Sequence, residues 1–529
     1  MIRLTELPDD ILEDIFHGMR DIMRFPGEPP YAPLQQEEDN SRSSADTEHK
    51  TVPLCANVIA LSHVCRHWRN LMLTRPHLWT FIRVTGSFPN RIMVNEMIER
   101  SGDFPLSILL TDSEQSNDAL YDLLGVMSVI SDHSERIREL GIILRRHARL
   151  VLDSLSECRL PRLEKLWIET QLEPEDCYAA SPAISIFDTV ITPLRVIHVS
   201  QMVFNRLPFH DLTQLELICS VSPPLYELLD TIRHSPLLQT LTLSIVLSKD
   251  EDGDEDEDDV DEEDEDEDDT VPHNEPPAVL SCLRRLQLQV DPVFSDAFSV
   301  LPHIAFPSST AVYLTFSGRR LASSLSKGCE SLEALARSVE HATFALDDNH
   351  AYLVSRSPQL SIDYEVADVE FDEPGQAQGE FAARLCDGFL AVPLPVLTSL
   401  SIRIFADPDS GLVLNHERFV RLFEAVPSIQ RLAVDVHPDD SAYVFTALAT
   451  IAKDERENEV VICPELKEFV VTWQAEPSAD DFWNLERCCH SRASGGCGVA
   501  RLETVAFPLL IRATLEQSVP CIVEVGYRE

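Results

Sequence analysis

A short apolar pattern recurs along most of this chain and constrains its fold more than any other feature. One apolar residue is followed by a second three positions later and by a third two positions after that. A polar or variable residue separates the last two apolar positions, as in a strand with one buried face. Residues 225–236 and 417–427 lie between such triplets and are typical of amphipathic helices that end at proline. Twelve triplets begin at Ile137, Leu163, Leu194, Leu212, Leu238, Leu283, Ala311, Val339, Leu397, Ile429, Leu466 and Leu502.

Strand–helix units of this period resemble leucine-rich repeats of irregular length, from about Leu106 to the C-terminus. The resemblance implies a solenoid whose row of strands forms an extended protein-binding surface. The 58-residue interval between Val339 and Leu397 has room for a degenerate unit near residues 360–364. An α/β domain with a parallel sheet is the alternative. The usual repeat has Asn or Cys three residues after the last apolar position. In this chain that position is occupied by Gln171, Met202, Ser220, Val246 and Asp291.

The N-terminal region predicts a separate helical module. Pro8 suits the first helical position, and the acidic residues after it favour the positive end of the helix dipole. An apolar stripe of Ile11, Leu12, Ile15 and Phe16 follows at helical spacing. A second amphipathic helix is predicted from Val58, Leu61, Cys65, Trp68 and Met72, which recur in steps of three and four. Pro76 ends this helix, and Leu78 and Trp79 precede the strand-like residues 80–84.

Together these residues resemble the F-box, specifically the F-box-like domain of fungal proteins. The resemblance implies a three-helix unit that binds a Skp-type adaptor and so joins a cullin-RING ubiquitin ligase. Residues 24–53 form a longer connection than usual, rich in Pro, Glu, Asp and Ser, and we expect a disordered insert there. The residues that the resemblance assigns to adaptor binding or to the module core are Leu7, Pro8, Ile11, Leu12, Ile15, Phe16, Leu61, Val64, Cys65, Trp68 and Trp79.

The predicted fold is therefore α/β, with an N-terminal three-helix F-box at residues 1–82 and an irregular leucine-rich-repeat-like α/β solenoid at residues 83–529. Residues 249–279 are predicted to be a disordered acidic insert, because residues 250–269 contain 18 acidic residues and no basic ones. We interpret this run as a solvated insert in preference to a landing site for basic proteins.

Charge and cysteine usage limit the possible partners. The formal net charge is −46 and no basic stripe is visible, so no nucleic-acid partner is predicted. There is no signal-peptide pattern and no run of 18 apolar residues, so we expect no membrane association. Thirteen cysteines without framework spacing predict reduced thiols and a cytoplasmic or nuclear protein.

Two groups of residues contain side chains that can bind metal, but we do not interpret either group as a metal site. Cys488, Cys489, His490 and Cys497 match no usual zinc spacing, and we expect a Gly-rich loop with free thiols there. The histidines at 63, 67 and 77 are predicted to be solvated surface residues. Phosphate-binding, dinucleotide-binding, esterase and metalloprotease motifs do not occur in the sequence. The sequence therefore predicts no catalytic residues, no cofactor and no metal.

The leading functional prediction is the substrate-recognition subunit of a Skp–cullin–F-box type ubiquitin ligase. The F-box would bind the Skp adaptor and the repeats would bind a protein target, so the chain itself would not be an enzyme. Two alternatives remain open: a leucine-rich-repeat scaffold without ubiquitin ligation, and an acidic-tract chaperone of basic proteins.

Overall fold

The structure is a computed structural model with a mixed α/β fold and a large, mostly parallel sheet. The chain forms two compact units, Met1–Ser235 and Pro236–Glu529. The predicted insert at 24–53 and the acidic run at 250–269 lie outside the described residues. Those are 8–12, 14, 16, 59, 61–85, 91–111, 118–144, 151, 158–170, 193–200, 209–222, 225–247, 276–290, 297–317, 329–346, 350–365, 394–404, 415–453, 459–504, 515–517 and 519–524.

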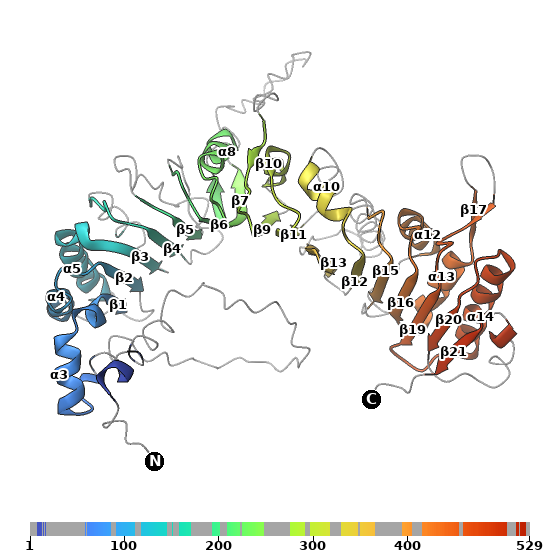
Figure 1. Cartoon of the computed structure of the whole chain (residues 1–529), viewed down its shortest axis with the longest axis horizontal. Coiled ribbons are helices and arrows are strands. Elements are labelled where there is room, and N and C mark those ends of the chain that lie inside the picture. The colour runs from blue at the N-terminus through green and yellow to red at the C-terminus, as the bar shows by residue number, and fades with distance from the viewer. Residues whose placement is uncertain are drawn as a thin grey trace, which may run out of the picture. The chain divides into compact units, whose positions relative to one another are not determined.

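In the first unit, the described residues form six strands that pair in chain order and run parallel. Helices α4 and α5 lie side by side on one face of the first strands (Figure 1). The strands are β1 (Phe81–Thr85), β2 (Leu106–Thr111), β3 (Ile137–Leu144), β4 (Lys165–Thr170), β5 (Val196–Ser200) and β6 (Gln214–Ser222). The helices are α3 (Arg66–Thr74), α4 (Arg91–Arg100), α5 (Asp118–Asp132) and α8 (Leu225–Arg233), with 3-10 turns η2 (Pro76–Trp79) and η3 (Ser134–Arg136).

The predicted strand register is confirmed in this unit. Leu140, Leu166 and Ile197, each the second residue of its triplet, are direct partners on successive strands. All three are buried, because alternate side chains of a strand point to the same face. Strand β1 pairs with β2, so the predicted boundary between residues 82 and 83 falls inside a sheet strand.

The second unit contains the remaining strands. Its main-sheet strands are β7 (Thr240–Leu247), β9 (Arg285–Val290), β11 (Ala311–Ser317), β12 (His341–Leu346), β13 (His350–Arg356), β14 (Gln359–Glu365), β15 (Ser399–Ile404), β16 (Arg431–Val436), β19 (Glu468–Trp473), β20 (Arg501–Thr504) and β21 (Cys521–Glu524). Two short pairs are β8 (Ala278–Val279) with β10 (Ile304–Ala305), and β17 (Ile451–Lys453) with β18 (Glu459–Val461). Strand β8 corrects the end of the predicted disordered insert at 249–279.

Helices of the second unit are η4 (Ala297–His303), α10 (Glu330–Ala336), α12 (His416–Ala425), α13 (Pro438–Leu448) and α14 (Ala479–Ser494). The predicted helices at 225–236 and 417–427 are confirmed as α8 and α12. Aromatic side chains join α13 and α14 to the sheet: the Phe445 ring lies 6.0 Å from Phe469, and the Phe482 ring lies 5.2 Å from Trp473. Figure 1 shows α12 and α13 close to strand β16.

Strand order in the second unit departs from chain order at one place. Strands β12, β13 and β14 form an antiparallel meander, in which β14 pairs with β11 and β12 pairs with β15. The degenerate unit expected at 360–364 coincides with strand β14, where Leu360 lies opposite Val312, but this strand belongs to the meander. The reversal was not predicted, because parallel and antiparallel strands show the same alternation of buried and exposed side chains.

Two predicted triplets are shifted. Leu314 lies opposite Leu288, so it occupies the third apolar position of its unit and not the second. Leu502 lies opposite Phe469 and occupies the second position and not the first. In β20 the third position is Thr504, a buried polar residue that an apolar pattern does not detect. Within the described part of the chain, no helix has the length and apolar composition needed to cross a membrane.

Candidate functional site

The N-terminal helical residues pack against helix α3. Residues 9–12, 14 and 16 are helical, and the Leu12 amide donates to the Pro8 carbonyl at 3.0 Å. Leu12 and Phe16 are buried, and the Phe16 ring meets the Trp68 ring edge-on with centroids 5.1 Å apart. His67, which we predicted to be solvated, is partly exposed and lies 3.0 Å from the Asp9 carboxylate. The two predicted halves of the module therefore contact each other.

The second predicted helix is interrupted at residues 63–65. Residues 59, 61 and 62 are helical, and α3 begins only at Arg66. Cys65 is extended, and its thiol accepts a hydrogen bond from the Trp68 amide at 3.4 Å. This is the geometry of a helix N-cap, which satisfies an amide left unpaired by the first turn. The continuous helix that we predicted is wrong here, because apolar spacing does not reveal a cap within the stripe.

Trp79 lies at the centre of the junction between the module and the sheet. Its side chain is 1% exposed, and its indole N–H donates to the Met72 carbonyl at 2.8 Å. The Arg100 guanidinium lies over the ring, 4.7 Å from its centroid, in a cation–π contact. Helix α3, turn η2 and helix α4 are thereby held together by one side chain.

The predicted adaptor-binding residues fall into groups that differ in exposure. Pro8, Ile11 and Val64 are exposed, with Ile11 at 43% and Val64 at 56%. Leu61 and Cys65 are half-buried. Leu73 is 49% exposed on the polar side of α3 and was missed by sequence reasoning, because it lies off the apolar stripe. The buried members are Leu12, Phe16, Trp68 and Trp79, whereas Leu7 and Ile15 lie outside the described residues.

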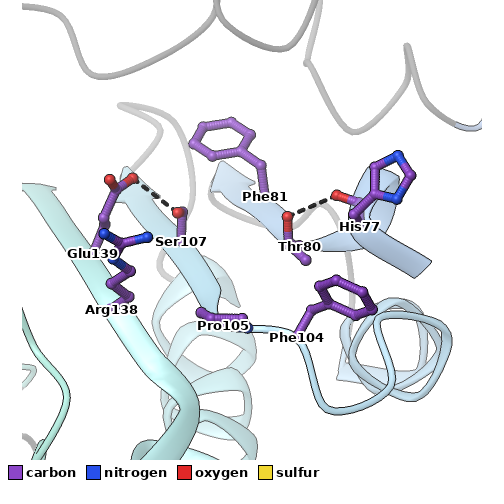
Figure 2. Close-up of a pocket in the computed structure, with 8 residues that line it drawn as sticks. All are labelled: His77, Thr80, Phe81, Phe104, Pro105, Ser107, Arg138 and Glu139. Atoms are coloured by element: carbon purple, nitrogen blue, oxygen red, sulfur yellow. Dashed lines mark hydrogen bonds between the residues drawn. The ribbon is translucent and has the colours of Figure 1, made fainter. Parts of the chain in front are cut away.

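A cavity of about 180 Å³ opens where the module meets the first strands (Figure 2). Its charged groups have partners. Glu139 accepts from the Ser107 hydroxyl at 2.8 Å and lies 3.3 Å from the Lys165 ammonium. Arg138 lies 2.8 Å from the Glu164 carboxylate, and this hydrogen bond raises the pKa of Arg138. The cavity is lined by His77, Thr80, Phe81, Phe104, Pro105, Ser107, Arg138 and Glu139.

Aromatic side chains line part of the cavity. The rings of His77 and Phe104 meet edge-on at 6.3 Å, and Phe81 faces the same space (Figure 2). A cavity of about 150 Å³ is enough to hold benzene. This one therefore has room for a ring or a branched aliphatic side chain.

Aromatic and charged groups also form a row on the sheet face of the first unit. Trp167 and His198 are partners on β4 and β5, and their rings stack with centroids 3.4 Å apart. The His198 Nδ1 atom lies 2.7 Å from the Glu216 carboxylate on β6. His198 and Glu216 were not identified from the sequence. The sequence could have indicated them only by their position, because each lies between the last two apolar residues of a triplet and so on the face opposite the buried one.

The Gly-rich loop that we predicted for the cysteine cluster near the C-terminus is wrong for three of its four residues, whereas Cys497 does follow Gly495 and Gly496 outside the helix. Cys488, Cys489 and His490 lie within α14, and both thiols are buried. Ser478 and Asp481 form a capping box that starts this helix, whereas Gly495 and Gly496 only follow its end. Among the described residues, no group of three or more His, Cys, Asp and Glu side chains is placed to hold a metal ion.

Burial predicts that these thiols react slowly in the folded protein. Desolvation raises the pKa of Cys488 to about 12, so its thiolate is scarce at pH 8. Exposed Cys521 serves as the internal control. We expect iodoacetamide at pH 8 to modify Cys521 at least about tenfold faster than Cys488, as measured by peptide mass spectrometry. Equal rates in the native protein, with both fast, would show that α14 is not packed as described.

The first unit thus combines a small helical module, on which Ile11, Val64 and Leu73 are exposed, with a sheet face that carries aromatic and charged groups. Such a combination is typical of protein-binding surfaces, in which aromatic anchors and arginines are enriched. No protein-family model matches the chain, and no curated protein is significantly similar to it.

Proposed function

We propose that the chain is the substrate-recognition subunit of a Skp–cullin–F-box type ubiquitin ligase. The observation that carries the proposal is the exposure of Ile11, Val64 and Leu73 on a module that buries Leu12, Phe16 and Trp68. Large apolar side chains left outside the core favour a protein partner. The F-box resemblance assigns Ile11 and Val64 to the Skp-type adaptor.

The proposed target-binding part is an irregular leucine-rich-repeat-like solenoid. Parallel pairing of consecutive strands, with helices between many of them, supports this architecture. The meander of β12 to β14 is one of its irregularities. We place the protein in the cytoplasm or nucleus, because its odd number of cysteines lacks a disulfide framework.

The proposed role needs no chemistry from the chain itself. A receptor of this kind raises the effective concentration of its target near the ubiquitin-loaded enzyme, so the geometry between its two ends matters most. Turn η2 ends at Trp79 and β1 begins at Phe81, so a single residue separates the module from the sheet. Such a short connection favours a fixed orientation of the adaptor relative to the first strands.

Co-purification tests this proposal with a matched pair of variants. We expect Ile11→Ala combined with Val64→Ala to reduce adaptor recovery by at least about tenfold, because each truncation removes an apolar contact. Ile92→Ala is the control, since Ile92 is also exposed but lies on α4. Adaptor and cullin are quantified by mass spectrometry after tagging the chain.

Three outcomes are informative. Loss of adaptor and cullin in the double variant alone supports the ligase subunit. Adaptor recovery without cullin would instead favour a scaffold that holds the adaptor for another purpose. Absence of the adaptor from the wild-type sample would refute the proposal.

A further inference from the structure

The sheet of the second unit has one face under helices and one face that they leave open. Leu400, Leu432 and Phe469 are buried partners on β15, β16 and β19. The residues immediately before them, Ser399 and Arg431 among them, point to the opposite face and are at least partly exposed. Polar side chains at these positions therefore form a continuous row across the strands.

This row is basic in an otherwise acidic protein. It contains four arginines and one histidine against one glutamate, whereas the whole chain has 89 acidic and 43 basic residues. Arg356, Arg431 and Arg501 are exposed. In order from β9 to β20, the basic row is Arg285, Ala311, Gln359, Arg356, His341, Ser399, Arg431, Glu468 and Arg501.

The contacts of these arginines within the chain are weak enough to permit a partner. Arg431 lies 3.7 Å from the Glu468 carboxylate, and Arg501 lies 3.3 Å from Glu503. Exposed ion pairs of this kind contribute little to stability. Arg285 lies over the Tyr313 ring, 5.1 Å from its centroid, and this contact fixes its orientation. Arg285 also donates to the Gln287 side chain at 2.9 Å, so a partner carboxylate can approach the exposed Arg356, Arg431 and Arg501 most easily.

The neighbouring row leaves room for a peptide backbone. It runs through Thr343, Ser401 and Ala433, which are small residues on the same face. Exposed Arg403 lies on its far side, opposite Asp435 on the next strand. The small side chains thus lie beside Arg431. The row continues through Val354, Ser361 and Tyr313 towards Arg285, and through Val470 to Glu503 beside Arg501.

The spacing of the arginines fits an extended chain that crosses the strands. Arg285, Arg356 and Arg431 are each three strands from the next, which is about 14 Å at the usual strand separation. Arg501 lies two strands beyond Arg431, or about 10 Å. Four residues of an extended peptide span about 13 Å, and side chains four residues apart point to the same face, so one peptide can reach Arg285, Arg356 and Arg431.

We propose that the basic row binds an extended acidic segment of a partner protein, with a carboxylate at every fourth residue, so that successive carboxylates point to the same face. Arginine suits this role because its planar guanidinium can donate two parallel hydrogen bonds to one carboxylate. This inference rests on the proposed function. It specifies that the surface that binds the target protein recognises an acidic segment of it. Its own test involves no adaptor, so the two proposals can fail separately.

The spacing of the arginines favours an acidic peptide over nucleic acid as the partner of the basic row. A nucleic-acid duplex carries one phosphate per about 1.7 Å, far more densely than the row carries arginines. The chain's net charge of −46 opposes such a polyanion over its whole length. A peptide with a few carboxylates meets mainly the local charges, because salt screens beyond about 8 Å.

Fluorescence anisotropy tests the proposal with a labelled peptide of about 14 residues that contains three glutamates, each four residues from the next. The full-length chain is titrated at roughly 50 mM and roughly 300 mM salt. A peptide of the same composition with its glutamates adjacent is the spacing control. Titration of a chain lacking residues 250–269 removes competition from the chain's own acidic run.

We expect Arg356→Ala combined with Arg431→Ala to weaken binding by at least about tenfold. Arg337→Ala combined with Arg421→Ala is the matched control, because both arginines are exposed but lie off the sheet, Arg337 at the C-cap of α10 and Arg421 on α12. The spaced peptide should bind more tightly than the clustered one, and salt should weaken it. The proposal would be overturned if the peptide bound neither the full-length chain nor the chain lacking residues 250–269. It would also be overturned if both double variants lost affinity equally, or if single-stranded DNA bound more tightly than the peptide. Thermal melting of each variant confirms that it is folded.

Discussion

Replacing Arg492 by methionine is expected to destabilise the second unit by about 3–5 kcal/mol. The Arg492 side chain is 1% exposed and donates to the carbonyls of Leu448, Ile462 and Cys463, at 3.2, 2.6 and 2.6 Å. It thereby joins α14 to the end of α13 and to the segment before β19. Methionine fills much of the volume but donates nothing, so three buried carbonyls lose their partner.

Hydrogen exchange is the appropriate measurement, because a chain with two units need not unfold in one step. The free energy of opening is compared for amides of α13 and α14 in the wild type and the variant. Arg487→Met is the control, since Arg487 lies on the same helix but is exposed. A change for Arg492→Met no larger than for Arg487→Met, both within about 0.5 kcal/mol, would refute the role of this side chain.

Replacing Trp79 by alanine is expected to destabilise the first unit by a similar amount, about 3–5 kcal/mol. The change leaves a large cavity, removes the hydrogen bond to the Met72 carbonyl and abolishes the contact with Arg100. Because Trp79 joins α3 to the first strand, we expect the amides of α3 and β1 to lose protection together.

Trp483→Ala provides the control for this large truncation. Trp483 is 48% exposed on α14, so the same change removes little buried area, and its effect should stay below about 1 kcal/mol. Hydrogen exchange of both variants measures the two effects. Unchanged protection of α3 in Trp79→Ala would contradict the assignment of Trp79 to the module core.

The sequence predicted the strands well for a clear physical reason. Leu166 and Ile197 belong to triplets whose alternation is set by burial of one strand face, and burial depends mainly on local pattern. The same pattern cannot distinguish β13, which runs antiparallel, from its parallel neighbours. Strand direction is decided by connections along the chain, and the alternation of side chains does not encode them.

The candidate sites were less predictable, because they depend on contacts between distant residues. His198 and Glu216 lie 18 residues apart and meet only when β5 pairs with β6. Cys65 matched the apolar stripe but serves as a cap for α3. Conversely, the glycines at 495 and 496 suggested a loop around Cys488, whereas the helix start is fixed at Ser478, ten residues earlier.

The most direct test of the proposed ligase subunit is complex formation between purified components. The full-length chain and a purified Skp-type adaptor are mixed, and the mass of the product is measured by size-exclusion chromatography with light scattering. We predict a one-to-one complex for the wild type and for Ile92→Ala, and separate components for Ile11→Ala combined with Val64→Ala. A folded wild-type chain that elutes apart from the adaptor at concentrations of roughly 10 μM or more would contradict the account, because stable interfaces bind below that level.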